Sequence, residues 1–171
     1  AEDFTVHGGS VGIIHMKKKT RAIELAIQEK VPMIWLLDGA GARAQDLIGE
    51  GLPECPHFLH IARHSGVAPQ VALVMGPSAG DSSLIASESE FIVMVEGISM
   101  LAAGGPPIVE AATGQKVSKE ELGGTDVHCR ISGVADNPAA TEEDAVAIAQ
   151  YYLSFLPNNA WEYPPWLPTD D

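Results

Sequence analysis

The sequence predicts a single α/β domain, and three observations support this prediction. Runs of consecutive apolar residues with the length of strands occur at 33–37, 71–75 and 91–95. Unbroken apolarity, in place of strict alternation, is typical of strands that are buried on both faces of a parallel sheet. Segments with helical periodicity lie between these runs, and strands that alternate with helices indicate an α/β architecture. A chain of 171 residues has room for one hydrophobic core.

The first half of the chain reads as alternating strands and helices. The segment 4–7 has strand character, and the glycines that follow it end that strand. A helix is expected over 14–29, where apolar residues recur on one face, and Pro32 marks its exit. A short helix over 58–64 ends at Gly66, because glycine is a common helix C-cap. A turn and a helix near 82–87 follow the second apolar run.

Helices dominate the expected second half. One helix should follow Pro106 and end at Gly114, and another should begin at Ser118, whose capping box closes with Glu121. The last long helix starts after Thr141, with three acidic residues in its first turn where they complement the helix dipole, and it stops before residue 157. The proline-rich tail looks like a linker. We therefore expect a domain over 1–157 and a linker-like tail over 158–171.

Composition and charge narrow the function classes. The net charge of −13 argues against a nucleic-acid scaffold, which needs a basic face. The apolar runs are too short to span a bilayer, and the first residues lack the basic and apolar pattern of a secretory leader. One local basic spot surrounds Lys17, Lys18 and Lys19. It is either a solvated helix face or a docking point for the phosphates of a nucleotide-like ligand.

Cysteine and histidine usage gives no sign of a metal or disulfide framework. Cys55 and Cys129 form no C-x-x-C pair, which fits a reducing compartment. We expect a cytoplasmic protein, or a mitochondrial-matrix protein if the source is eukaryotic. His57, His60 and His64 have no nearby carboxylate in ligand register, so no metal site is expected.

Two glycine-bearing turns are the candidate site. The first runs over 38–43 and the second over 76–80, and each is expected between a buried strand and a helix. Such a turn leaves free backbone N–H groups at a helix N-terminus, and small residues let a ligand approach the backbone. A thioester carbonyl between the two turns would receive N–H donors from both, and these would stabilise an enolate oxygen.

Other interpretations of these turns stay open at this point. The glycines can simply permit tight strand-to-helix turns. Residues 39–44 formally fit G-x-G-x-x-G/A of dinucleotide-binding folds, but the acidic residue expected about twenty positions later is missing. A Clp-like serine hydrolase would use Ser78 or Ser82 as nucleophile with His128, although no spacing supports that triad.

The ordered blocks along the chain resemble one known family. They are the residues 3–10, the first turn 38–43 with Gln45, the blocks 69–72 and 75–80, Gly105-Pro106, Gly114, 117–124, His128 and 132–135. Together they are similar to the N-terminal carboxyltransferase domain of biotin-dependent acyl-CoA carboxylase β subunits, of the propionyl-CoA carboxylase type. The resemblance covers nearly the whole chain.

The resemblance implies a partial crotonase/Clp-like fold of ββα repeats, without the N-terminal strands and the homologous C-terminal domain. It implies that acyl-CoA binds here while carboxyl passes from carboxybiotin to the α-carbon, with free biotin as the base. Biotin would be carried by a partner domain or subunit. The implied partners are a carboxyltransferase C-domain, a biotin carboxylase or biotin carrier subunit, and further copies of the chain in a homo-oligomer. Alone, the chain should bind acyl-CoA without turnover.

Carried onto this chain, the resemblance implies a set of site residues. The backbone donors are Ala40, Gly41, Ala42, Ala79 and Gly80, and the substrate-binding residues are Gly39, Arg43, Gly76, Pro77, Ser78, Asp81, Lys17 and Lys19.

Two departures from the family pattern stand at the turns. Gly39 and Ala40 replace a Ser-Gly pair, and Asp81 stands where a second glycine is usual. Asp81 either brings a carboxylate beside the acyl pocket or caps the helix and faces away. These departures leave a further alternative, a catalytically silent scaffold subunit of a carboxylase assembly.

Overall fold

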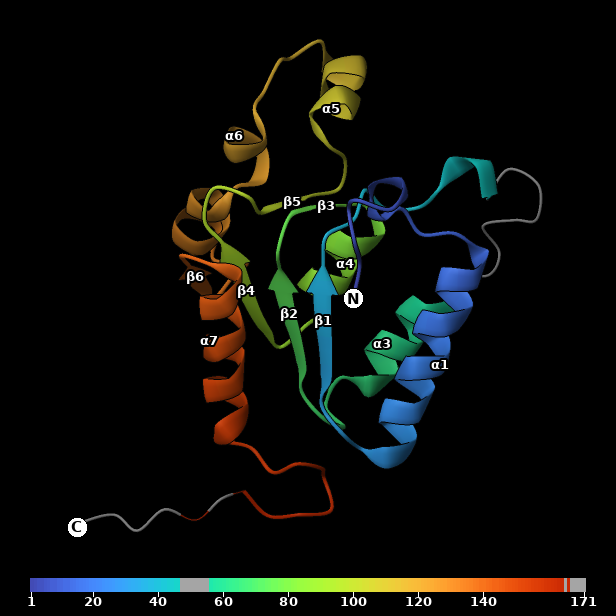
Figure 1. The fold of residues 1–171 in the computed structure, drawn as a ribbon, viewed down its shortest axis with the longest axis vertical. Helices are drawn as coiled ribbons and strands as arrows, with labels where there is room; N and C mark the ends of the chain where they lie inside the picture. Colours follow the sequence, from blue (N-terminus) through green and yellow to red (C-terminus); the bar gives the residue numbers. More distant parts are fainter. Residues whose placement is uncertain (47–55, 165, 167–171) are drawn as a thin grey trace.

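A parallel sheet of four strands forms the centre of the molecule (Figure 1). The computed structural model describes residues 1–46, 56–164 and 166. The strand order is β1 (Met33–Leu37), β2 (Gln70–Val74), β4 (Phe91–Val95) and β6 (Asn137–Ala139), and every pair is parallel. All five residues of β2 are buried, as the unbroken apolar run predicts for a central strand. The predicted α/β class is confirmed.

A second, two-stranded parallel sheet crosses the carboxyl ends of the first (Figure 1). It consists of β3 (Pro77–Ala79) and β5 (Met100–Ala102). β3 follows β2 and precedes helix α4 (Asp81–Ser87), while β5 follows β4 and precedes helix α5 (Pro106–Thr113). Each unit thus places one strand in each sheet before its helix, which is the expected ββα repeat. Three-residue strands carry too little pattern for sequence analysis to detect them.

Helices cover both faces of the larger sheet. Helices α1 (Ile13–Glu29), α3 (Pro56–His64) and α4 lie on one face, and α7 (Glu142–Ser154) lies on the other. Alternate residues of each strand supply the two cores. One core joins Ile23, Ile61 and Ile85 of the helices to Trp35, Leu37, Ala72, Val74, Ile92 and Met94. The other joins Ala145 and Ala149 of α7 to Val71, Leu73, Val93 and Val95.

Most predicted helices begin and end within a residue or two of the expected positions. The capping box of α6 (Lys119–Gly123) is formed, because Ser118 N–H donates to Glu121 Oε2 at 2.9 Å and Glu121 N–H donates back to Ser118 Oγ at 3.2 Å. Gly114 ends α5 with a left-handed φ of 75°, as expected of a glycine C-cap. Figure 1 shows α5 and α6 beyond the carboxyl ends of the strands.

The strand predicted over 4–7 is wrong. These residues form a turn that leads into the 3-10 helix η1 (His7–Gly9). Side chains capture the backbone donors that a strand would need: Thr5 N–H donates to Asp3 Oδ1 at 2.9 Å, and Phe4 N–H donates to Asp38 Oδ2 at 3.3 Å. Strand β6 and the π-helix η2 (Asp126–Ser132) were also not predicted.

The N-terminal segment lies against the outer edge of β1. Glu2 N–H donates to the Leu36 carbonyl at 2.9 Å, on the opposite side of β1 from β2. A cavity of about 450 Å³ continues along this edge and is lined by β1 and by residues of α1. Within the described part of the chain, no helix has both the length and the apolarity to cross a membrane.

Candidate active site

The two predicted turns meet at the carboxyl ends of β1 and β2. Ala79 N–H donates to the Gly39 carbonyl at 3.0 Å, which joins the turns directly. A Cβ on Gly80 would lie 3.7 Å from Gly41 Cα, and a Cβ on Gly41 would lie 2.7 Å from the Ala79 carbonyl oxygen. Only glycine permits this approach at position 41. Gly80 also has φ 57° and ψ −113°, a combination that L-residues with a side chain rarely adopt.

The structure reduces the set of available backbone donors. Ala40 N–H donates to the Gly8 carbonyl at 2.9 Å, Ala79 N–H is bound to Gly39, and Gly80 N–H donates to the Ala102 carbonyl at 3.2 Å. The expectation of a free donor is therefore not met at these three positions. Among the described residues, the N–H groups of Gly41 and Ala42 have no acceptor. Both lie in the first turn, so the predicted donors that stay free come from one short stretch of backbone.

The second turn differs from its prediction in form. A short strand, β3, occupies most of it, so Gly76 and Gly80 flank a strand instead of sharing one loop. Pro77 pairs with Met100 in the small sheet, and Ser78 is fully buried with its hydroxyl 3.5 Å from the Gly76 carbonyl oxygen. These residues shape the turn through their backbone. The Ser78 hydroxyl donates to the Gly76 carbonyl and is not a donor to the first turn.

Residues 8–10 support the first turn from outside. The Gly8 carbonyl accepts the Ala40 N–H, and Ser10 contacts Arg43 through its hydroxyl and its carbonyl. Arg43 Nε donates to Ser10 Oγ at 3.1 Å and Arg43 Nη2 donates to the Ser10 carbonyl at 3.0 Å, while Nη1 lies 3.2 Å from Asp46 Oδ2. The expected substrate-binding Arg43 thus uses its guanidinium to hold the turn to the N-terminal loop.

Asp38 lies at the start of the first turn in a poorly hydrated position. Its Oδ2 accepts the Phe4 N–H, whereas its Oδ1 is buried and has no hydrogen-bond partner among the described residues. Burial raises the pKa of Asp38 above its ordinary value of 3.8, and the carboxylates of Glu2 and Asp3 add to the increase. The carboxyl group packs against Gly76, where a Cβ would collide with it.

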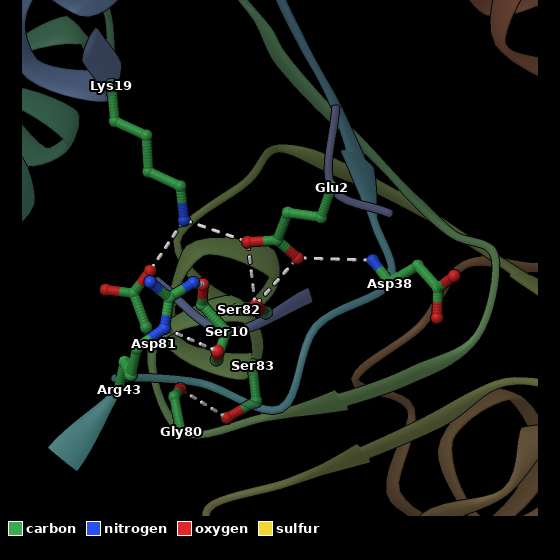
Figure 2. Close-up of polar contacts among 9 residues, drawn as sticks. All are labelled: Glu2, Ser10, Lys19, Asp38, Arg43, Gly80, Asp81, Ser82 and Ser83. Carbon is green, nitrogen blue, oxygen red and sulfur yellow. Dashed lines mark hydrogen bonds and ion pairs between the residues drawn. The ribbon is translucent and has the colours of Figure 1, made fainter. Parts of the chain in front are cut away.

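A buried ionic network lies behind the two turns (Figure 2). Lys19 Nζ lies 2.9 Å from Glu2 Oε1 and 2.6 Å from Asp81 Oδ2. Asp81 is the first residue of α4, and its side chain does not cap that helix, whose N-cap is Gly80. The expectation that Asp81 caps the helix is therefore wrong, and its carboxylate is paired with a lysine from α1. Lys19 is accordingly engaged inside the protein, whereas Lys17 is exposed on α1.

The serine-hydrolase alternative is wrong for this structure. Ser82 Oγ donates to Glu2 Oε1 and Oε2 at 2.9 and 2.8 Å, and Ser78 is hydrogen-bonded to Gly76. Both ring nitrogens of His128 have other partners, the Leu101 carbonyl at 2.9 Å and Ser132 Oγ at 3.0 Å. Within the described part of the chain, neither serine has the histidine partner that would activate it as a nucleophile.

The remaining candidate ligands lie apart from the turns. His60 Nε2 is 3.6 Å from Glu24, His64 Nε2 bonds the Val31 carbonyl at 3.0 Å, and the side chain of His57 and all of Cys55 lie outside the described residues. Burial raises the pKa of the Cys129 thiol, which disfavours a reactive thiolate there. A dinucleotide fingerprint requires an acidic residue at the end of a strand about twenty positions after the glycines. Residues 58–61, which stand at that distance, lie in helix α3 instead of a strand.

Glu2 is the site residue that sequence reasoning missed. Its carboxylate contacts Lys19, Ser82 and the Asp38 N–H, the last at 3.2 Å. The contact to Ser82 joins residues 80 positions apart in the sequence. No local spacing predicts such a contact; only the residues' common position behind the turns reveals it.

Comparison with known proteins places this geometry in a family. A sequence model described as the carboxyl transferase domain matches residues 1–171. The chain belongs to the carboxyl transferase domain family. It is 37% identical over 171 residues to methylmalonyl-CoA decarboxylase subunit alpha of Veillonella parvula and 37% identical to the propionyl-CoA carboxylase beta chain of Roseobacter denitrificans. The chain is covered completely in both alignments.

Solved structures of carboxyl transferase domains share the fold. The transcarboxylase 12S structure with methylmalonyl-coenzyme A and methylmalonic acid bound has a TM-score of 0.89 and 35% identity, and the match covers 99% of this chain. The beta subunit of geranyl-CoA carboxylase from P. aeruginosa has a TM-score of 0.81 and 28% identity over 90% of this chain. The expected crotonase-like fold is confirmed as a partial domain, because the chain spans only about a third of these relatives, 33% and 29%. It likewise spans 34% of each of the two curated relatives.

Proposed function

We propose that this chain is the acyl-CoA-binding part of a biotin-dependent acyl-CoA carboxyltransferase. The observation that carries the proposal is the close meeting of the two turns, which leaves the N–H groups of Gly41 and Ala42 without acceptors. Family membership supports it, and so do relatives named for propionyl-CoA and methylmalonyl-CoA. The proposed ligand is the thioester of an acyl-CoA, with its carbonyl oxygen at these two donors.

The backbone donors would act on the charge that develops at the carbonyl. When a base removes a proton from the α-carbon, the C–H electron pair forms the enolate and negative charge moves to the carbonyl oxygen. Fixed N–H groups stabilise that charge more than the neutral thioester, and one such donor typically contributes about 3 kcal/mol to the barrier. The enolate carbon then forms a bond to the carbon of CO₂, and the carbonyl double bond is restored. No reactive side chain is required of this chain.

Carboxybiotin, when bound on a partner domain or subunit, would supply the carboxyl group. The two free donors at Gly41 and Ala42 fit one carbonyl oxygen. The ureido oxygen of biotin would be bound by a separate biotin-binding domain. We propose that a carboxyltransferase C-domain, a biotin carboxylase or carrier subunit and further copies of the chain complete the enzyme. The matched transcarboxylase 12S structure is itself described as a hexamer assembly.

The binding site is tested by isothermal titration calorimetry with three ligands: propionyl-CoA, free CoA, and S-propyl-CoA, a thioether that lacks the carbonyl. Two net hydrogen bonds of about 0.5–1.5 kcal/mol each predict that propionyl-CoA binds roughly tenfold more tightly than the thioether. Equal affinities would show that the turns do not hold the carbonyl and would favour the silent scaffold. Binding of none of the three ligands would remove acyl-CoA as the ligand.

A further inference from the structure

We propose that Glu2, Lys19, Asp81 and Ser82 form a brace that fixes the spacing of the two turns and thereby positions the carbonyl-binding donors. These four residues are called the brace below. The inference rests on the proposed function, because its purpose is the geometry of that same site. None of the four is proposed to touch the substrate, so they are positioning residues. Figure 2 shows the contacts that join Lys19 to Glu2 and Asp81 and Glu2 to Ser82, with Asp38 and Gly80 of the two turns nearby.

Glu2 connects both turns through one carboxylate. Its Oε2 accepts the backbone N–H of Asp38 at 3.2 Å, at the start of the first turn. The same carboxylate accepts the Ser82 hydroxyl at 2.8 and 2.9 Å, in the first helical turn after Gly80. A Cβ on Gly39 would lie 2.6 Å from Glu2 Oε2, so the carboxylate is packed closely against the first turn. A shift of either turn would break these contacts.

Lys19 closes the brace from helix α1. Its ammonium lies between Glu2 and Asp81, and the exposed fractions of the three side chains are only 13%, 6% and 4%. Ion pairs screened from water in this way are costly to break, because removal of one partner leaves a buried charge without compensation. The brace carries two carboxylates and one ammonium. The Ser82 hydroxyl and the Asp38 N–H supply the remaining donors that Glu2 needs.

The brace also orients the Asp81 carboxylate. Gly80 and Asp81 are adjacent, and a Cβ on Gly41 would lie 3.5 Å from Asp81 N. A carboxylate released from Lys19 at this position would oppose the negative charge of an enolate. The ion pair with Lys19, which Glu2 shares, offsets part of that charge and holds the carboxylate toward α1. Asp81, which departs from the family pattern at this turn, is therefore paired with a cation of the same chain.

The test measures how strongly each variant prefers propionyl-CoA over S-propyl-CoA, by calorimetry at a temperature where every variant is folded. This affinity ratio reports on the carbonyl contacts, whereas the CoA portion is common to both ligands. We expect Lys19→Met to lower the ratio from roughly tenfold to less than threefold, which corresponds to the loss of about one hydrogen bond. Lys19→Arg should recover most of the ratio, because it restores the cation. Lys116→Met, which removes an exposed lysine of the same charge, should leave the ratio unchanged.

A second measurement is independent of any ligand. The Ala79 N–H bond to the Gly39 carbonyl links the turns, so its hydrogen exchange, followed by NMR, reports on their spacing. Lys19→Met should accelerate exchange at Ala79 relative to the core amide of Leu73, which follows global unfolding. Faster exchange at Ala79 supports the brace even if the wild-type protein binds no acyl-CoA, an outcome that would refute the proposed function alone. A Lys19→Met variant with unchanged ratio, or with exchange that rises equally at Ala79 and Leu73, would refute the brace.

Discussion

At the scale of single residues, the site depends on two glycines that no other residue can replace without cost. Gly41 has a φ of 83° and faces the Ala79 carbonyl, and Gly80 has a φ of 57°. Family patterns and small-residue turns were enough to predict both positions from the sequence. Sequence could not show which N–H groups are free, because Ala102 and Gly8, the acceptors for Gly80 and Ala40, come from distant segments.

Gly41→Ala should therefore destabilise the protein more than a glycine substitution that adds backbone strain alone. Gly66 is the matched control, because its φ is 77° and a Cβ there would meet no atom within 4 Å. Gly66→Ala should lower the free energy of unfolding by about 1 kcal/mol. The contact with Ala79 should raise the loss at position 41 to at least about 2 kcal/mol, measured by urea denaturation. Equal losses at the two positions would contradict the close approach of the turns.

Asp38 gives a prediction for the pH dependence of stability. Because burial raises its pKa above 3.8 in the folded protein, its stabilising contribution is present below that value and is lost as pH rises through the folded pKa. The melting temperature of Asp38→Asn should therefore increase relative to wild type between pH 4 and pH 7. Melting curves at constant ionic strength measure this difference. A difference that stays constant, or falls with pH, would show that the Asp38 carboxyl is not desolvated.

At the scale of elements, long periodic segments were predictable and short ones were not. Helix α1 and strand β4 carry enough periodic or apolar residues to decide their own conformation. The strands β3, β5 and β6 have three residues each, and their conformation depends on pairing with partners that are distant in sequence. The segment 4–7 shows the same point in reverse. Its strand-like residues form a turn because Asp3 and Asp38 accept the backbone N–H groups.

Ser99 connects the ends of two strands and offers a test at this scale. Its buried hydroxyl accepts the Val95 N–H of β4 at 2.7 Å and donates to the Val74 carbonyl of β2. Ser99→Ala removes the side-chain partner of both buried backbone groups, so we expect a loss of about 1–3 kcal/mol in the free energy of unfolding. Ser87→Ala is the control, since the Ser87 hydroxyl is exposed and bonds only the Leu84 carbonyl. A loss at Ser99 no larger than at Ser87 would contradict this role.

At the scale of the whole molecule, the chain matches one part of larger carboxyl transferase proteins. It spans about a third of the matched relatives, and the two predicted donors that stay free both lie in its first turn. The tail returns to the body of the domain, where Lys30 Nζ lies 3.6 Å from the centre of the Trp161 ring and Ala160 N–H donates to the Lys30 carbonyl at 2.9 Å. The first residues of the predicted linker, 158–171, are thus anchored to the end of α1.

We propose that the first turn holds a thioester carbonyl through the backbone N–H groups of Gly41 and Ala42, with the second turn packed against it. Isotope-edited infrared spectroscopy of propionyl-CoA labelled with ¹³C at the carbonyl measures the polarisation of that bond directly. We predict that the carbonyl stretch of the bound ligand lies at lower wavenumber than in water, because fixed donors polarise the bond more than mobile water does. The shift should disappear in Gly41→Ala. A stretch at or above its position in water, for a ligand shown to be bound, would show that these N–H groups do not bind the carbonyl.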